Sequence, residues 1–197
     1  MKSAAPEPLD LILFGGSSGS LAIFESILKL LVRPASSALI FILHRGKSSK
    51  SVLPHLFRRK TSVIMREPHH LDCIEKGNVY FAFHDYHMLI GPDARFYYDL
   101  SEKDFFSRPS IDATFLSAAV SGIPVRAAML FSGSSVDGAF GMKILAEKGF
   151  KTYVFDPAQS ESQRMPEEAL RQYADHRVLF QEDFLEVIND IIYPLTT

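Results

Sequence analysis

Two continuous apolar runs in the first quarter of the chain constrain its fold more than any other feature. Residues 11–14 and 38–43 are short apolar stretches that end at glycine or at a polar residue, a pattern typical of strands buried on both faces. Between them, apolar side chains over residues 21–31 recur every three or four positions, which predicts a helix packed against a sheet. A strand–helix–strand unit predicts two parallel strands joined by a right-handed crossover.

The rest of the chain continues this alternation with one interruption. Helices are predicted over residues 51–60, 110–122, 138–148, 166–173 and 181–192. Further strands are predicted over residues 127–131 and 152–155, and shorter ones over residues 62–65, 79–83 and 88–90. The shorter strands are separated by turn residues, which indicates a hairpin-like insertion. The expected fold is α/β, a doubly wound, mostly parallel sheet with helices on both faces and a short β-hairpin-like insertion.

The length of 197 residues suits one domain with a substantial core. We expect residues 9–197 to form this domain and residues 1–8, which contain two prolines, to be a flexible N-terminus. The formal net charge is −2 and no long basic run is present, so electrostatics give little support to nucleic-acid binding. The basic triplet at residues 58–60 is expected to be a solvated helix end.

Cysteine usage and hydropathy indicate the compartment. Cys73 is the only cysteine, which rules out an intramolecular disulfide and is typical of a reducing environment. Because Leu71 and Ile74 flank it, we expect Cys73 to fill an apolar face rather than to act as a nucleophile. The apolar run at residues 9–14 is too short for a signal-peptide core or a membrane span. We expect a soluble, cytoplasmic protein without membrane insertion.

Three polar clusters follow predicted strands, at residues 15–20, 44–46 and 132–138. Loops at the carboxyl ends of parallel strands converge on one crevice, so these clusters are expected to meet. The first contains Gly15-x-Ser17-x-Gly19, a nucleophile-elbow pattern whose sharp turn exposes a serine hydroxyl and leaves backbone N–H groups free to hold an oxyanion. It lacks the dinucleotide and P-loop patterns. A plain glycine-rich turn remains the alternative.

A serine nucleophile needs a base, and histidine is the usual one near neutral pH. His44 ends the strand predicted to lie beside that of Ser17, and Asp137 lies in a loop after another buried strand, where it could orient the imidazole. The alternatives are a structural histidine for His44 and a helix cap before Gly138 for Asp137. The order Ser, His, Asp differs from that of ordinary α/β-hydrolases.

Several histidines raise the question of a metal site. The segments His69-His70-x-Asp72 and His84-Asp85-x-His87 hold possible ligands close together in sequence. Neither has an established zinc spacing, so solvated loop histidines are expected, with no metal and no cofactor.

Four segments together resemble a known family. They are residues 15–19, His44, residues 108–112 (Arg-Pro-Ser-Ile-Asp) and residues 133–139 (Gly-Ser-Ser-Val-Asp-Gly-Ala). In order and spacing they are similar to the catalytic domain of the chemotaxis protein-glutamate methylesterases, the CheB type. Residues 85–88 (Asp-Tyr-His-Met) and 165–169 (Met-Pro-Glu-Glu-Ala) extend the resemblance over nearly the whole chain.

The resemblance implies a serine esterase that hydrolyses glutamyl methyl esters on methylated chemoreceptors and releases methanol, with deamidation of receptor glutamines as a possible second activity. It implies a triad of Ser17, His44 and Asp137, with backbone N–H groups near Ser18 and Ser134 forming the oxyanion hole. Arg108 and Asp112 could shape the mouth of the active site or form an ion pair at a helix start, and the second, structural role is expected for both.

The sequence departs from the family pattern around all three triad residues. Ser18-Gly19-Ser20 follows Ser17 where the family usually has Thr-Gly-Gly, and Arg45-Gly46 replaces the Met-Pro that usually follows the histidine. Ser134 and Ser135 replace Met and Gly of the aspartate loop. The family's receiver domain has no counterpart in the 197 residues, so a separate receiver domain or regulator is expected, or the sequence is part of a longer protein. A binding or signalling module with weak turnover and an esterase for small molecules remain open.

Overall fold

The structure is a computed structural model and describes residues 8–44, 63–105 and 107–195. Within these residues, seven parallel strands form one sheet in the order β3-β4-β2-β1-β7-β8-β9. The strands are β1 (Leu11–Gly16), β2 (Ala38–Leu43), β3 (Met65–Arg66), β4 (Val79–Phe81), β7 (Val125–Leu130), β8 (Thr152–Phe155) and β9 (Arg177–Leu179). The helices are α1 (Ser20–Leu30), α3 (Ile111–Val120), α4 (Ala139–Glu147), α5 (Arg164–Gln172) and α6 (Phe184–Ile192), with a short 3-10 helix at Pro157–Gln159.

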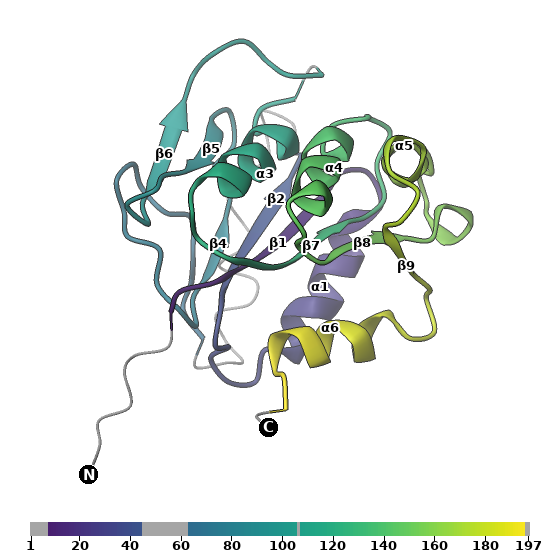
Figure 1. The fold of residues 1–197 in the computed structure, drawn as a ribbon, viewed down its shortest axis with the longest axis horizontal. Coiled ribbons are helices and arrows are strands. Elements are labelled where there is room, and N and C mark those ends of the chain that lie inside the picture. The colour runs from purple at the N-terminus through teal and green to yellow at the C-terminus, as the bar shows by residue number, and fades with distance from the viewer. Residues whose placement is uncertain (1–7, 45–62, 106, 196–197) are drawn as a thin grey trace.

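Helices cover both faces of this sheet (Figure 1). The side chains of β1 alternate between the two layers: Leu11 and Leu13 join the core formed with α3, α4 and α5, while Ile12 and Phe14 join the core formed with α1 and α6. All four are completely buried. A continuous apolar run is therefore what a central strand between two helical layers requires, and the predicted doubly wound α/β fold is confirmed.

The predicted insertion is smaller than expected, and of the strands assigned to it only the one over residues 88–90 belongs to the hairpin. The antiparallel hairpin consists of β5 (His87–Ile90) and β6 (Phe96–Asp99). The earlier short strands, β3 and β4, belong instead to the main parallel sheet. Assigning them to the insertion was wrong, since a two- or three-residue strand has too little sequence to display a burial pattern. Strands β6 and β9 were not predicted.

Two expectations fall outside the described residues: the helix over residues 51–60, with its basic triplet at 58–60, and the flexibility of residues 1–7. In the part of the chain that is described, no helix has the length and apolarity needed to cross a membrane.

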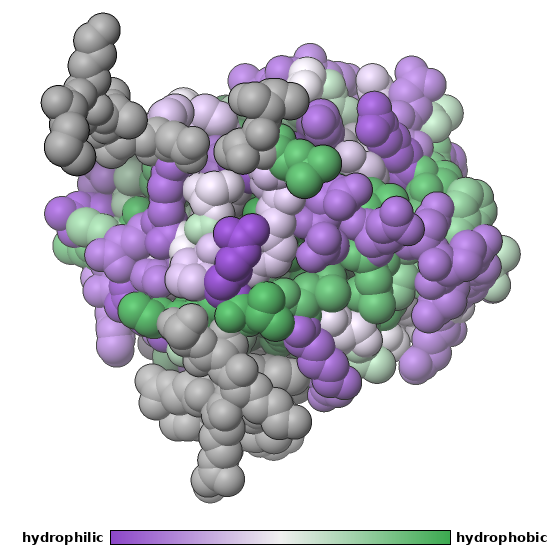
Figure 2. Space-filling model, turned by 90° about the horizontal axis from the view of Figure 1, so that it is seen from below, coloured by the Kyte–Doolittle hydropathy of each residue, from purple (hydrophilic) through white to green (hydrophobic). Residues whose placement is uncertain are grey.

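Seen from below, where α6 lies, the surface carries a band of hydrophobic residues bordered by hydrophilic ones (Figure 2).

Helix α6 closes one face of the sheet through a single apolar side. Phe184, Ile188 and Ile192 are spaced by four residues and are all buried, whereas Glu186 on the same helix is exposed. This spacing places the three apolar side chains on one face of the helix.

Replacing Ile188 with alanine should lower the free energy of unfolding by about 2–5 kcal/mol, because a cavity would form under α6. Urea denaturation of Ile188→Ala, with Glu186→Ala as the control on the same helix, measures this. Equal unfolding midpoints for the two variants would show that α6 is not part of the cooperative core.

Candidate active site

The carboxyl ends of the three central strands bring the predicted triad residues together. Strands β1 and β2 are in register to their last residues, Gly16 and Leu43, so Ser17 and His44 leave the sheet side by side. The backbone N–H of His44 donates to the carbonyl of Gly16 (3.1 Å). On the other side of β1, strand β7 leads into the loop that carries Asp137. The expectation that these loops converge is confirmed.

The turn after β1 is held by hydrogen bonds to the loop after β7. The backbone N–H of Ser17 donates to the carbonyl of Ser132 (2.9 Å), which also accepts the hydroxyl of Ser20 (2.7 Å). In return, the hydroxyl of Ser132 donates to the carbonyl of Ser18 (2.6 Å). Gly19 has φ of 81°, a left-handed conformation that glycine adopts without strain. The nucleophile-elbow sequence thus forms a strand–turn–helix whose position is fixed.

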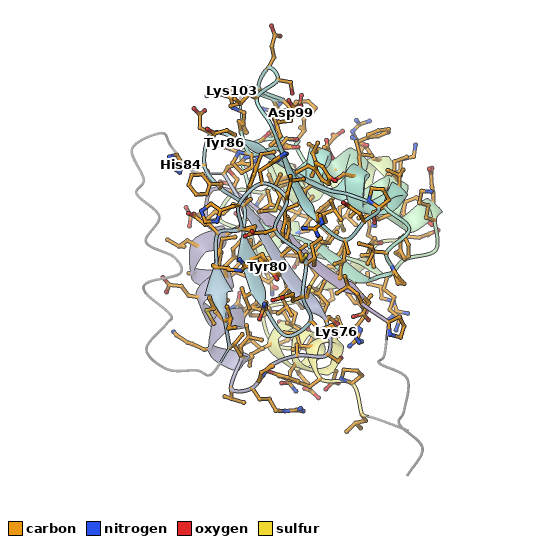
Figure 3. The ribbon with its side chains drawn as sticks, turned by 90° about the vertical axis from the view of Figure 1, so that its left-hand side faces the viewer. Lys76, Tyr80, His84, Tyr86, Asp99 and Lys103 are labelled. Carbon is orange, nitrogen blue, oxygen red and sulfur yellow. The ribbon has the colours of Figure 1, made fainter. Side chains whose placement is uncertain are left out.

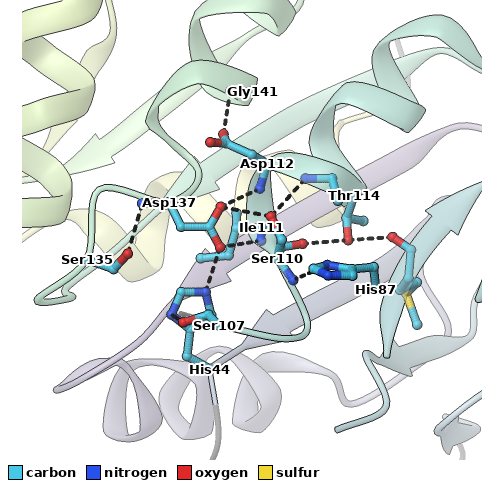
Figure 4. A network of polar contacts seen from close by, with 12 residues as sticks. His44, His87, Ser107, Ser110, Ile111, Asp112, Thr114, Ser135, Asp137 and Gly141 are labelled. Carbon is cyan, nitrogen blue, oxygen red and sulfur yellow. Dashed lines mark hydrogen bonds and ion pairs between the residues drawn. The ribbon is translucent and has the colours of Figure 1, made fainter. Parts of the chain in front are cut away.

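His44 and Asp137 form the central polar contact of the site (Figure 4). The Nε2 atom of His44 lies 2.8 Å from Oδ2 of Asp137, and the two side chains are 9% and 0% exposed. A carboxylate in this position orients the imidazole and stabilises its protonated form.

The carboxylate of Asp137 is also bound to the first turn of α3. It accepts the backbone N–H groups of Ile111 (2.8 Å) and Asp112 (2.9 Å) and the hydroxyl of Ser110 (3.0 Å). Backbone donors at a helix N-terminus stabilise a negative charge. The alternative role of Asp137, as the N-terminal cap of the helix that follows it, was wrong, because α4 begins after Gly138 without a side-chain cap. Asp137 instead binds the start of a neighbouring helix.

Asp112 is a second buried carboxyl behind Asp137. Its Oδ1 accepts the backbone N–H of Gly141 on α4 (2.6 Å), so it links α3 to α4. Burial and the nearby charge of Asp137 raise the pKa of the Asp112 carboxyl to about 7. Asp112 forms no ion pair with Arg108, whose guanidinium binds Asp85 (3.0 Å). The expected structural role of both residues agrees with these contacts, but the ion pair at the helix start was wrong.

His87 supports the same helix start from the hairpin. Its Nδ1 accepts the backbone N–H of Ser110 (3.2 Å) and its Nε2 contacts the carbonyl of Glu102 (3.0 Å). It is only 2% exposed, so the expectation of a solvated loop histidine was wrong for His87. No spacing pattern in the sequence distinguishes it from the exposed His69 and His70.

Ser17 and His44 line one pocket of about 310 Å³. Its walls are completed by Phe105, Ser107, Ser134, Ser135, Val136 and Arg164. Within the described residues, no hydrogen bond joins the Ser17 hydroxyl to His44; the hydroxyl that contacts Nδ1 of His44 is that of Ser107 (3.1 Å). Hydrogen bonds between catalytic groups are often loose without substrate and tighten in the complex. Sequence reasoning did not identify Ser107 or Arg164, which carry no motif.

The predicted oxyanion residues lie on the two loops beside Ser17. Ser18 and Ser134 are both exposed, and Ser134 lines the pocket. Their backbone N–H groups have no hydrogen-bond acceptor among the described residues. Two such donors beside a serine hydroxyl are what stabilisation of a tetrahedral oxyanion requires.

The segments considered for metal binding do not converge. Among the described residues, no group of three or more His, Cys, Asp or Glu side chains is arranged to hold a metal ion. The carboxylates of Asp72 and Asp85 are paired with Arg66 and Arg108. His84 lies beside Tyr86 on the side of the molecule that carries the hairpin (Figure 3).

Cys73 is exposed, which contradicts its expected place in an apolar face. It forms an isolated bridge with Arg95, and of its two apolar neighbours only Ile74 is buried. Periodicity was a weak guide here because this stretch is irregular.

The raised pKa of Asp112 predicts how stability depends on pH. The folded chain holds the Asp112 proton more tightly than the unfolded chain does. The resulting contribution to the free energy of unfolding is fully present below pH 4 and is lost as pH rises toward 7. Asp112→Asn keeps an acceptor for Gly141 without a titrating charge. Between pH 5 and pH 8 the wild type should lose this contribution and the variant should not. The free energy of unfolding of the variant minus that of wild type should therefore be more than ~1 kcal/mol larger at pH 8 than at pH 5. Urea unfolding at both pH values tests this, and an unchanged difference would contradict it.

Comparison with known proteins identifies the family. Residues 12–188 match the family described as CheB methylesterase. A Leptospira interrogans protein named for protein-glutamate methylesterase and protein-glutamine glutaminase activity is 29% identical over 176 residues, covering 89% of this chain and 91% of that protein. The protein-glutamate methylesterase FrzG of Myxococcus xanthus is 29% identical over 174 residues, which cover 88% of this chain but 52% of FrzG. The CheB methylesterase catalytic domain of Thermotoga maritima shares the fold, with a TM-score of 0.83 at 19% identity over 93% of this chain and 98% of that one. The chain therefore belongs to the CheB methylesterase family.

Proposed function

We propose that this protein is a protein-glutamate methylesterase that hydrolyses glutamyl methyl esters on methylated chemoreceptors. The observation that carries the proposal is the contact of His44 with the buried Asp137, where His44 also lines one pocket with Ser17, in a chain of this family. The proposal includes deamidation of receptor glutamines, because relatives carry that activity in their names. We place the protein in the cytoplasm, where a receptor's signalling region is accessible, and assign its control to a separate receiver domain or regulator.

In the first half-reaction, Ser17 Oγ attacks the ester carbonyl while Nδ1 of His44 takes its proton. Asp137 is bound to Nε2, so the protonated ring is stabilised by an adjacent carboxylate. The backbone N–H groups of Ser18 and Ser134 hold the negative oxygen of the tetrahedral intermediate. When the intermediate collapses, His44 returns the proton to the departing oxygen, which leaves as methanol, and an acyl group remains on Ser17.

In the second half-reaction, water attacks the acyl group with His44 again as the base. The glutamate carboxylate is released and Ser17 recovers its proton. With a glutamine side chain as substrate, the same steps would release ammonia in place of methanol. No cofactor is needed in either case, since all the proton transfers run through His44.

Ser17→Ala should reduce methanol release from methylated chemoreceptor membranes by several orders of magnitude, because the nucleophile is lost. Ser26→Ala is the matched control, because its hydroxyl donates to the carbonyl of Ala22 within α1 and does not line the pocket. A folded wild type that releases methanol no faster than Ser17→Ala would contradict the proposal. The protein would then be a binding module on this fold or an esterase for another substrate, which reactivity of Ser17 toward an organophosphonate distinguishes.

A further inference from the structure

The base nitrogen of His44 is engaged by a second hydroxyl, that of Ser107. The two carboxylate oxygens of Asp137 accept three hydrogen bonds from the start of α3, so they act as acceptors in this site. The proton of a neutral His44 ring therefore resides on Nε2, which donates to Asp137 at 2.8 Å. Nδ1 then carries the lone pair, and the Ser107 hydroxyl at 3.1 Å donates to it.

Ser107 is held in this position by its own short segment. Its backbone N–H donates to the carbonyl of Asp104 (2.7 Å). The next residue, Arg108, binds Asp85 (3.0 Å) and the carbonyls of Leu100 and Ser101 (both 2.9 Å). Two residues further on, Ser110 binds Asp137. One segment thus contacts both the histidine and the aspartate, so the place of Ser107 is determined by the framework of the site.

The surroundings of Ser107 do not suit a nucleophile. Ser17 lies at the start of a helix, next to the free backbone N–H groups described above. Ser107 is followed by Arg108 and then by Pro109, which has no N–H to offer an oxyanion. The Ser107 hydroxyl therefore has a proton acceptor in Nδ1, whereas Ser18, with its backbone donor, directly follows Ser17.

We propose that Ser107 is a positioning residue that competes with Ser17 for the base nitrogen of His44. In the substrate-free enzyme its hydroxyl occupies the lone pair that must accept the proton of Ser17, and Ser17 is activated only when it takes over this contact. Both hydroxyls line the same pocket as His44, so an acyl group entering that pocket can drive the exchange. This inference rests on the proposed roles of Ser17 and His44.

The test compares how fast a fluorophosphonate modifies Ser17 in wild type, Ser107→Ala and Ser107→Thr. Intact-protein mass spectrometry gives the rate and peptide mapping gives the modified residue. Ser107→Ala should react about fivefold faster than wild type, since a neutral hydrogen bond contributes ~1 kcal/mol net. Ser107→Thr keeps the hydroxyl and should react at the wild-type rate. Ser101→Ala is the matched control. Ser101 lies in the same connection between β6 and α3, and its hydroxyl donates to the carboxylate of Asp99 rather than to His44.

Each other outcome has a definite meaning. If Ser107→Ala reacts no faster than wild type while Ser17 remains the modified residue, Ser107 does not compete for the base and the inference is overturned. It is also overturned if the label is found on Ser107 in the Ser17→Ala variant, because Ser107 would then be a nucleophile. If Ser17→Ala is modified as fast as wild type and not at Ser107, the proposed function itself fails.

Discussion

The binding of the Asp137 carboxylate to the start of α3 is the interaction on which the rest of the site depends. A buried charge is tolerated only when hydrogen bonds replace the water it loses. Here two backbone N–H groups and the hydroxyl of Ser110 do so, and the positive end of the helix adds to their effect. His44 is the remaining partner of this carboxylate among the described residues, so the helix that stabilises the charge also fixes the orientation of the imidazole.

The same helix start collects supports from three other parts of the chain. His87 reaches it from the hairpin, Gly141 reaches it from α4 through Asp112, and Arg108 fixes the preceding segment. A second network, between the turn at Ser18 to Ser20 and Ser132, holds the segment that carries Ser17. Two hydrogen-bond networks therefore meet at one pocket, and the loop from Ser132 to Asp137 connects them.

The parts of this architecture visible in the sequence are those that rest on burial patterns and on strand order. The apolar runs of β1, β2 and β7 located the three central strands, and the convergence of their loops located Ser17, His44 and Asp137. Contacts that depend on tertiary packing could not be predicted from the sequence. Nothing local marks His87 as buried or Ser107 as a partner of His44, and Cys73 lies in an irregular stretch where periodicity misleads. Strand β9, which was not predicted, has three residues and is too short to show a pattern.

The position of β1 at the exact middle of the seven-stranded sheet has a consequence for how such a protein can diversify. Three strands flank it on each side, and the reactive groups come from β1 and its two immediate neighbours. The outer strands β3, β4, β8 and β9 can therefore be lengthened or reshaped over evolutionary time without displacing the strands that carry the chemistry. Part of the pocket wall also comes from outside these strands, since Phe105 precedes α3 and Arg164 begins α5. Target choice and bond cleavage can accordingly change at different rates in related lineages.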